Sequence, residues 1–353
     1  MTASPDRSRL VLLLVAALML GLIGVAWAAG GSADDPANDP ANDAANEPAS
    51  EAGPTTAPTP SSTPETPTPE TEAPSAPATP ATPVAPPPAA TPATLPGGRT
   101  RVFGGGHFLV AYYGTAGTGS LGVLGETGPD QAIRRLRRAA RPFARPGRPV
   151  QPVYELIVTV ADGGPGPDGD FSHDIDRAAV RSYVRAAHRD GALLLLDLQP
   201  GRSDFLTVAK RWEWALRQPH VGLALDPEWR MKRRERPGQV IGSVRAREVN
   251  RVSAWLSQLT ATHQLPEKLF VLHQFRTSMI EDVRRVRPRA GLAMVQHVDG
   301  FGTRTQKRAT YGAVARPSQF SMGFKLFYDE DVNRMGPREV HRLRPRVRFI
   351  SFQ

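Results

Sequence analysis

A pair of carboxyl groups follows an apolar run near the middle of this chain of 353 residues. Residues 221–225 are apolar, and Asp226, Pro227, Glu228 and Trp229 come directly after them. An apolar run of this length that stops at a proline is typical of a buried strand in a parallel sheet. Because side chains alternate along an extended strand, we expect Asp226 and Glu228 to point to the same side. Such a pair could carry general acid and base catalysis.

The neighbours of the two carboxyl groups suggest how the roles divide. Glu228 is the better general acid, because apolar neighbours such as Pro227 and Trp229 would raise its pKa towards neutrality. Asp226 or Asp197 would then stay ionised as a base or as a stabilising charge. A plainer interpretation stays open, in which Asp226 caps a turn and Glu228 forms an ion pair with a surface arginine such as Arg230.

Strand and helix patterns alternate from residue 99 onward. Apolar runs predict strands at 108–113, 154–161, 192–198, 221–225, 269–273, 292–298, 320–327 and 347–352. Amphipathic periodicity predicts helices at 129–141, 174–189, 203–218, 243–263, 278–286, 303–314 and 337–343. Eight strands with helices between them predict an α/β fold, a (β/α)8 TIM barrel. The competing doubly wound sheet is disfavoured, since no Gly-x-Gly-x-x-Gly motif follows the first strand. No helix follows the eighth strand, and we expect residues 96–107 to cover that gap.

Polar side chains end almost every predicted strand and would meet at one face of the barrel, where such folds carry their chemistry. Amides and carboxylates hydrogen-bond to sugar hydroxyls, aromatic rings stack on sugar faces, and two acids flank a glycosidic bond during hydrolysis. The residue types therefore predict a carbohydrate site with Glu228, Asp226 and Asp197 as catalytic residues. The predicted substrate-binding residues are Tyr112, Tyr113, Gln199, Trp229, His273, Gln274, Gln296, His297, Asp299, Lys325 and Tyr328; Asp162, Asp329, Ser351 and Gln353 are further polar residues at strand ends.

The segment Leu223-Ala-Leu-Asp-Pro-Glu-Trp229 resembles the end of strand four in glycoside-hydrolase-type TIM barrels. Chitinase-like members of that group end this strand with Asp-x-Glu. The resemblance implies that Glu228 is the acid/base residue and that Asp226 orients it. It covers the domain by architecture and only three residues by motif. The family's further upstream aspartates are replaced here by His220, Gly222 and Ala224, which is a departure from the chitinase pattern.

Two other functions remain open. A metal-dependent hydrolase of the amidohydrolase type would place histidines on strands five and six, where His273 and His297 lie. Such barrels also have a His-x-His on strand one and an aspartate on strand eight, and both are missing here. We therefore predict no metal and no cofactor. The other alternative is a cell-surface barrel that binds glycan without cleaving it; Asp197, Asp226 and Glu228 together favour an enzyme.

The first 98 residues differ in composition from the rest. Arg7 and Arg9, the apolar stretch 10–27 and Ala26-Trp27-Ala28 predict a signal peptide at 1–28 cleaved after Ala28, or else an uncleaved membrane anchor. Residues 29–98 are rich in Pro, Thr and Ala and predict a disordered linker before a single domain at 99–353. We therefore expect a secreted or cell-surface protein.

The absence of cysteine and the excess of basic residues limit the functions that this chain can have. No cysteine occurs, which excludes disulfides, thiolate nucleophiles, Cys-ligated metals and a lipidated cysteine. Residues 99–353 carry 42 basic and 24 acidic residues, a surplus that could attract an acidic polymer. Many arginines are scattered along helices without interleaved aromatic residues, so we predict no nucleic-acid partner. We expect a monomer whose partner is a polysaccharide or cell-wall glycan, and Lys325 with the arginine surplus suggests an anionic one.

Overall fold

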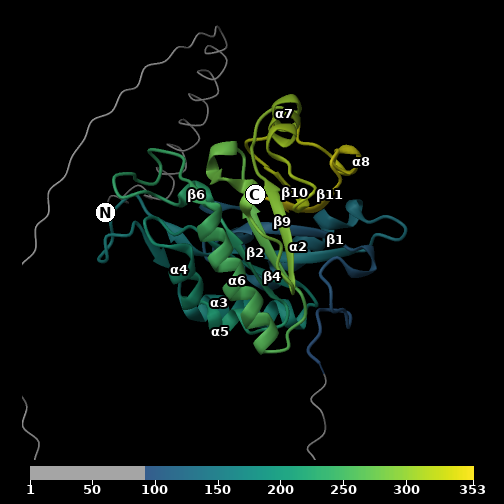
Figure 1. Cartoon of the computed structure of the whole chain (residues 1–353). Coiled ribbons are helices and arrows are strands. Elements are labelled where there is room, and N and C mark those ends of the chain that lie inside the picture. Colours follow the sequence, from purple (N-terminus) through teal and green to yellow (C-terminus); the bar gives the residue numbers. More distant parts are fainter. Residues whose placement is uncertain (1–91) are drawn as a thin grey trace, which may run out of the picture. The chain divides into compact units, whose positions relative to one another are not determined.

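Eight parallel strands form a closed barrel in the computed structural model, which describes residues 92–353. β1 pairs with β2 on one side and with β11 on the other, and this closes the sheet (Figure 1). The parallel barrel predicted from the sequence is confirmed; the signal or anchor and most of the linker predicted for 1–98 lie outside the described residues. The barrel strands are β1 (Phe108–Gly114), β2 (Val150–Ala161), β4 (Leu193–Leu198), β5 (Val221–Leu225), β7 (Lys268–His273), β9 (Leu292–Val298), β10 (Ser321–Leu326) and β11 (Val347–Phe352).

Helices lie outside the strands, as Figure 1 shows. Three short strands complete the sheets: β3 (Ser172–Asp174) pairs antiparallel with β2, and β6 (Val244–Arg245) pairs with β8 (Ile280–Glu281). Within residues 92–353, no helix is both long enough and apolar enough to cross a membrane. The helices are α2 (Pro129–Ala140), α3 (Arg177–Arg189), α4 (Phe205–Arg211), α5 (Glu213–Leu216), α6 (Ala246–Thr262), α7 (Arg304–Val314) and α8 (Pro337–Arg342).

Local hydrogen bonds explain where several helices begin. The Asp204 carboxylate accepts hydrogen bonds from the backbone N–H groups of Leu206 and Thr207, so α4 begins after Asp204 and not at Ser203 as predicted. The Ser203 hydroxyl is engaged elsewhere, since it donates to Asp170 at 2.9 Å. Thr303 starts α7 with a capping box, which agrees with the start of the helix predicted at 303–314.

The helix predicted at 278–286 does not form. Two 3₁₀ turns, η6 (Thr277–Met279) and η7 (Val283–Arg285), flank β8 instead. Asp282 has a left-handed backbone with φ of 57°, which breaks any continuous helix there. Residues 280–281 pair with β6, so the sequence periodicity was overridden by a sheet contact.

The N-terminal end of the barrel is closed by the segment before β1. Leu95 and Val102 are buried against inward side chains of the barrel. The backbone N–H of Val102 donates to Glu267 Oε2 at 2.8 Å, which ties this segment to the start of β7. Residues 96–107, which we expected to fill the gap beside the last strand, therefore lie under the barrel.

The outer face of β11 and β1 is covered by aromatic side chains from two short elements. Phe143 of η4 (Arg141–Phe143) stacks on Phe108 with ring centroids 5.9 Å apart and contacts Phe352 at 6.0 Å. His341 of α8 lies over Phe108 at 4.9 Å, and its Nε2–H donates to the Phe143 carbonyl at 3.0 Å. These packed rings occupy the place where an eighth helix would lie.

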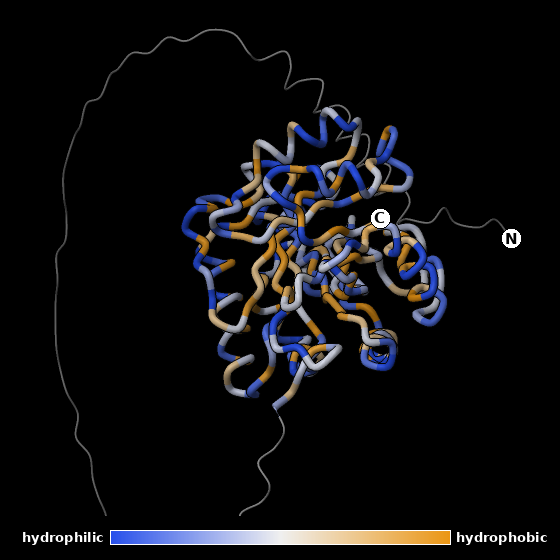
Figure 2. Tube along the Cα trace, turned by 90° about the vertical axis from the view of Figure 1, so that its right-hand side faces the viewer, coloured by the Kyte–Doolittle hydropathy of each residue, from blue (hydrophilic) through white to orange (hydrophobic). Residues whose placement is uncertain are grey.

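The strand side chains alternate between two apolar layers. Outward residues such as Leu194 and Phe270 pack under the helices in the large core, and inward ones fill the barrel. Figure 2 shows hydrophobic strands at the centre and hydrophilic segments around them. The inward layer nearer the N-terminal ends consists of Leu109, Ala111, Val153, Leu193, Leu195, Ala224, Leu269, Val271, Ala293, Val295 and Phe349.

Candidate active site at the C-terminal end of the barrel

The inward positions change from apolar to polar towards the C-terminal end of the barrel. Each of the eight strands contributes a polar side chain there, and Asp226 follows β5 directly. All of them are buried, and Asp299, just beyond β9, is 6% exposed. The eight are Tyr113, Glu155, Asp197, Asp226, His273, His297, Lys325 and Ser351.

His273 lies between three carboxylates. Its Nδ1–H donates to Asp299 Oδ2 at 3.0 Å, and its Nε2 lies 3.2 Å from Glu155 Oε1 and 3.8 Å from Asp197 Oδ1. Burial alone would lower the pKa of His273, but the carboxylates of Asp299 and Glu155 outweigh it and raise this pKa well above its ordinary value. His273 is therefore a buried cation at neutral pH.

Lys325 is the second buried cation of the site. Its Nζ lies 3.6 Å from Asp299 Oδ2 and 3.7 Å from the centroid of the Tyr113 ring. Burial lowers the pKa of Lys325, yet Asp299 and the other nearby carboxylates raise it overall. Burial would in turn raise the pKa of Asp299, but Lys325 and His273 lower it to about 2. Asp299 is thus ionised and holds both cations.

The remaining carboxyl groups outnumber these cations. Burial raises the pKa of Asp197 to about 6, although His273 pulls it down, and the neighbouring Glu155 raises it further. Tyr113 Oη donates to Asp197 Oδ2 at 2.9 Å, which favours its ionised form. Burial and the adjacent Glu228 raise the pKa of Asp226 well above its ordinary value. At neutral pH, Asp197 is mostly ionised, whereas Asp226 keeps its proton to a higher pH than an ordinary aspartate does.

Glu228 is the least buried of these acids and lies on the turn η5 (Pro227–Trp229) directly after β5. Burial, and then the charge of Asp299, raise the pKa of Glu228 to about 7. Its carboxylate makes no hydrogen bond or ion pair with any of residues 92–353. Arg230 pairs with Glu248 instead, at 3.0 Å, so the surface ion pair allowed by the sequence is not formed.

The backbone of this segment differs from the expected one. The turn at 227–229 follows β5, so the alternation of an extended strand does not govern the orientations of Asp226 and Glu228. The Asp226 side chain caps no turn, and its Oδ1 has no hydrogen-bond partner among the described residues. The two carboxyl groups are still near enough for Glu228 to raise the pKa of Asp226.

His297 lies beside His273 but in a different state. Burial and the positive charge of His273 lower the pKa of His297 well below its ordinary value, so its ring is neutral. Its Nε2 lies 3.2 Å from the Ser351 hydroxyl, and its ring centroid is 5.1 Å from that of His273. A Cβ atom on Gly323 would approach His297 Cδ2 to 2.3 Å, so glycine makes room for this ring.

Several residues predicted to line the site lie elsewhere. Tyr112 points outward, where its hydroxyl lies 3.4 Å from that of Tyr328, and both rings pack on Phe352. Gln296 donates to Gln274 at 2.6 Å and to the Val314 carbonyl at the end of α7, which is also outside the barrel. These four residues do not join the inward cluster.

The other predicted residues are nearer to it. Gln199 donates to Tyr113 Oη at 3.4 Å and accepts from the Ala161 N–H, so it lies at the edge of the cluster. Trp229 is half-buried on the same turn as Glu228. Tyr113, Asp197, Asp226, His273, His297, Asp299 and Lys325 form the cluster itself.

Glu155 was missed by the sequence analysis. It lies within β2 and pairs in register with Tyr113 of β1, which places it level with the other polar residues. A signal was available: Glu155 is the only charged residue in the apolar stretch 153–160, and it falls on the inward side. Glu155 lies six residues before the end of β2, so a position at a strand end did not mark it as a site residue.

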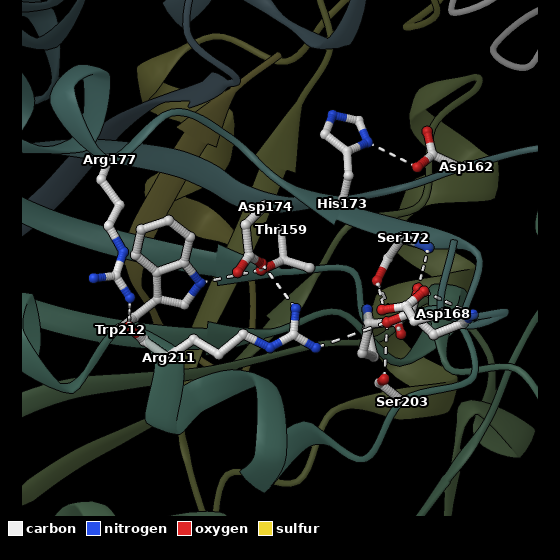
Figure 3. A network of polar contacts seen from close by, with 12 residues as sticks. Thr159, Asp162, Asp168, Ser172, His173, Asp174, Arg177, Ser203, Arg211 and Trp212 are labelled. Atoms are coloured by element: carbon white, nitrogen blue, oxygen red, sulfur yellow. Dashed lines mark hydrogen bonds and ion pairs between the residues drawn. The ribbon is translucent and has the colours of Figure 1, made fainter. Parts of the chain in front are cut away.

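A second polar network holds the loop between β2 and β3 to α4, as Figure 3 shows. Asp170 accepts from Ser203 at 2.9 Å, and Arg211 lies 3.7 Å from Asp170 and 3.3 Å from Asp174. Thr159 donates to Asp174 at 2.6 Å and accepts from the Trp212 indole N–H at 3.1 Å. These bonds are internal to the protein and fix the end of β2 beside α4.

The residues described, 92–353, place no group of three or more His, Asp or Glu side chains so that it could hold a metal ion. Both ring nitrogens of His273 face carboxylates, and Nε2 of His297 faces Ser351. In comparisons with known proteins, no protein-family model and no curated protein matches this sequence.

Proposed function

We propose that this protein is an exported glycoside-hydrolase-like enzyme that cleaves extracellular or cell-wall polysaccharide by carboxylate acid/base chemistry. The observation that carries the proposal is the state of Glu228. It is the most accessible acid of a buried charged cluster at the C-terminal end of a parallel barrel, and its pKa is raised to about 7. A carboxyl group that keeps its proton near neutral pH can protonate a leaving oxygen.

The charges around Glu228 suit the same reaction. Glycosidic cleavage passes through a positively charged, oxocarbenium-like transition state and needs a second carboxylate that is ionised. Asp197, with a pKa of about 6, meets this need better than Asp226, whose pKa lies well above its ordinary value. We therefore assign proton donation to Glu228 and the ionised partner to Asp197, with the negative charges of Asp299 and Asp197 helping to keep the Glu228 proton in place.

A second candidate is a cell-surface barrel that binds glycan without cleaving it. The burial of the partner acids favours this alternative, since Asp197 is 0% and Asp226 is 1% exposed. A base or nucleophile has to reach the sugar or its attacking water. The two candidates share the ligand and differ in whether Asp197 becomes accessible when that ligand binds.

Turnover of a panel of wall and storage polysaccharides separates them. We expect the full chain to release reducing ends, Glu228→Gln to lose about 10²–10⁴-fold in kcat, and Asp197→Asn to lose a similar amount. Glu213→Gln is the matched control, because Glu213 lies in α5 and pairs with Arg217 on the surface. If the wild type and all variants bind glycan and none releases reducing ends, the enzyme proposal is wrong and the protein is a glycan-binding barrel.

A further inference from the structure

An arginine-lined groove runs along the outside of the barrel beside α6. It lies where the helix predicted at 278–286 is replaced by β8 and two short turns, and it encloses about 1030 Å³. One carboxylate, Asp282, stands among its lining residues. The charged lining otherwise consists of seven arginines: Arg245, Arg247, Arg251, Arg284, Arg285, Arg287 and Arg289.

Only part of this positive charge is neutralised by the protein. Arg245 pairs with Glu281 at 3.0 Å, and Arg251 pairs with Asp204. Arg285 lies 3.9 Å from Asp282, a long contact between two exposed side chains. Within the described part of the chain, Arg247, Arg284 and Arg287 are exposed and form no ion pair. The groove therefore has a net positive charge that an anionic partner could neutralise.

Two half-buried polar side chains hold the arginine-bearing segment in place. Asn250 of α6 donates to the Arg285 carbonyl and accepts from the Arg287 N–H, both at 2.8 Å. The Gln319 amide donates to the carbonyls of Val283, Arg284 and Val286 at 3.1–3.2 Å. Because the backbone is fixed before binding, less conformational entropy is lost when the arginines engage a ligand.

We propose that this groove binds a linear, phosphate-bearing polymer that lacks bases, through the charges along its backbone. All the cationic residues of the lining are arginines, whose planar guanidinium groups match phosphate oxygens bidentately. Arg247 and Arg251 lie one helical turn apart on α6, about 6 Å by the rise of an α-helix, so they can reach successive charges of a chain. A small anion would engage only two or three of the seven.

The rest of the lining argues against other polymers. It contains no aromatic side chain on which a nucleic-acid base or a sugar could stack. The amides of Asn250 and Gln319, which could otherwise read hydroxyls or base edges, are used by the backbone. The arginine side chains are therefore the groups of this groove that would bind the polymer, through its charges.

The test is binding of fluorescently labelled long-chain polyphosphate to the full chain, measured by anisotropy at several salt concentrations. The triple variant Arg247→Gln/Arg284→Gln/Arg287→Gln is expected to bind at least tenfold more weakly. The slope of log Kd against log salt should fall by about one for each arginine removed. The matched control is Arg134→Gln/Arg138→Gln/Arg185→Gln, which removes the same charge from exposed positions on α2 and α3 and should bind like the wild type.

Four outcomes would overturn the proposal. Equal weakening by the control variant would mean that net charge alone binds the polymer, and unchanged binding by the groove variant would place the site elsewhere. Inorganic phosphate competing as well as the polymer would leave a small-anion site. Single-stranded DNA binding at least tenfold more tightly than polyphosphate would make the groove a nucleic-acid surface. Folding of each variant is checked by its thermal unfolding midpoint.

Discussion

The two halves of the barrel interior use the same strands and have opposite chemistry. Leu109 lies four residues before Tyr113 on β1, and Val271 lies two residues before His273 on β7. The half near the N-terminal ends buries apolar side chains, which favours folding. The half near the C-terminal ends buries four carboxyl groups and two cations, with Glu228 partly buried beside them, and this is costly unless each charge is compensated. The contrast shows that the first half stabilises the fold and that the second half lowers the stability wherever its buried charges are not fully compensated.

The largest effect is expected from breaking the charged half. Lys325→Met removes the cation that, with His273, holds Asp299 ionised, and leaves buried carboxylates without compensation. We expect the free energy of unfolding to fall by about 3–5 kcal/mol at pH 7. The loss should shrink towards pH 4, because the carboxyl groups can then take up protons. Urea unfolding at pH 7 and at pH 4 measures this loss of stability. A loss that is the same at both pH values would contradict the role of Lys325 in compensating the buried carboxylates.

A substitution in the apolar half should cost stability without any dependence on pH. Leu109 is fully buried in the inward layer, so Leu109→Ala should lower the free energy of unfolding by about 2–5 kcal/mol through lost burial and a cavity. No charge is involved, and the loss should therefore not depend on pH between 4 and 7. The same urea experiment serves as the measurement. A pH-dependent loss would show that the two halves are not energetically separate.

The smallest effect is a slope in stability with pH. The folded-state pKa of Glu228, about 7, lies above its ordinary 4.5, so its proton favours the folded state. This contribution is fully present below pH 4.5 and is lost as the pH rises through 7. Asp197, raised to about 6, acts in the same direction. The free energy of unfolding of Glu228→Gln, measured by urea unfolding, should therefore fall less steeply between pH 4.5 and 7 than that of the wild type. An identical fall in the two proteins would contradict the raised pKa of Glu228.

The sequence was sufficient for the barrel because its strands are strongly apolar and separated by helical periodicity. It failed at 278–286, where pairing of β8 with β6 and the left-handed Asp282 overrode that periodicity. It also misplaced residues 96–107, since no local pattern shows that Leu95 and Val102 pack under the barrel.

Seven of the eight inward polar residues of the candidate site could be anticipated in the same way, and Glu155 could not. Position at a strand end identified Asp197, His273 and Lys325, but it could not separate inward from outward side chains, so Tyr112 and Gln296 were included. Which way a side chain points depends on the register of the closed sheet. The ion pairs that set the pKa of His273 join β2, β7 and the end of β9, and such contacts between distant segments leave no mark on local sequence.

Direct titration of the carboxyl groups tests the central claim, that the C-terminal half of the barrel keeps an acid protonated near neutral pH. Glutamate and aspartate side-chain ¹³C shifts would be followed by NMR from pH 3 to pH 9 in the wild type and in Glu228→Gln. We expect one glutamate carboxyl to titrate near pH 7 in the wild type and to be missing from Glu228→Gln. Titration of every glutamate carboxyl below pH 5 would contradict it.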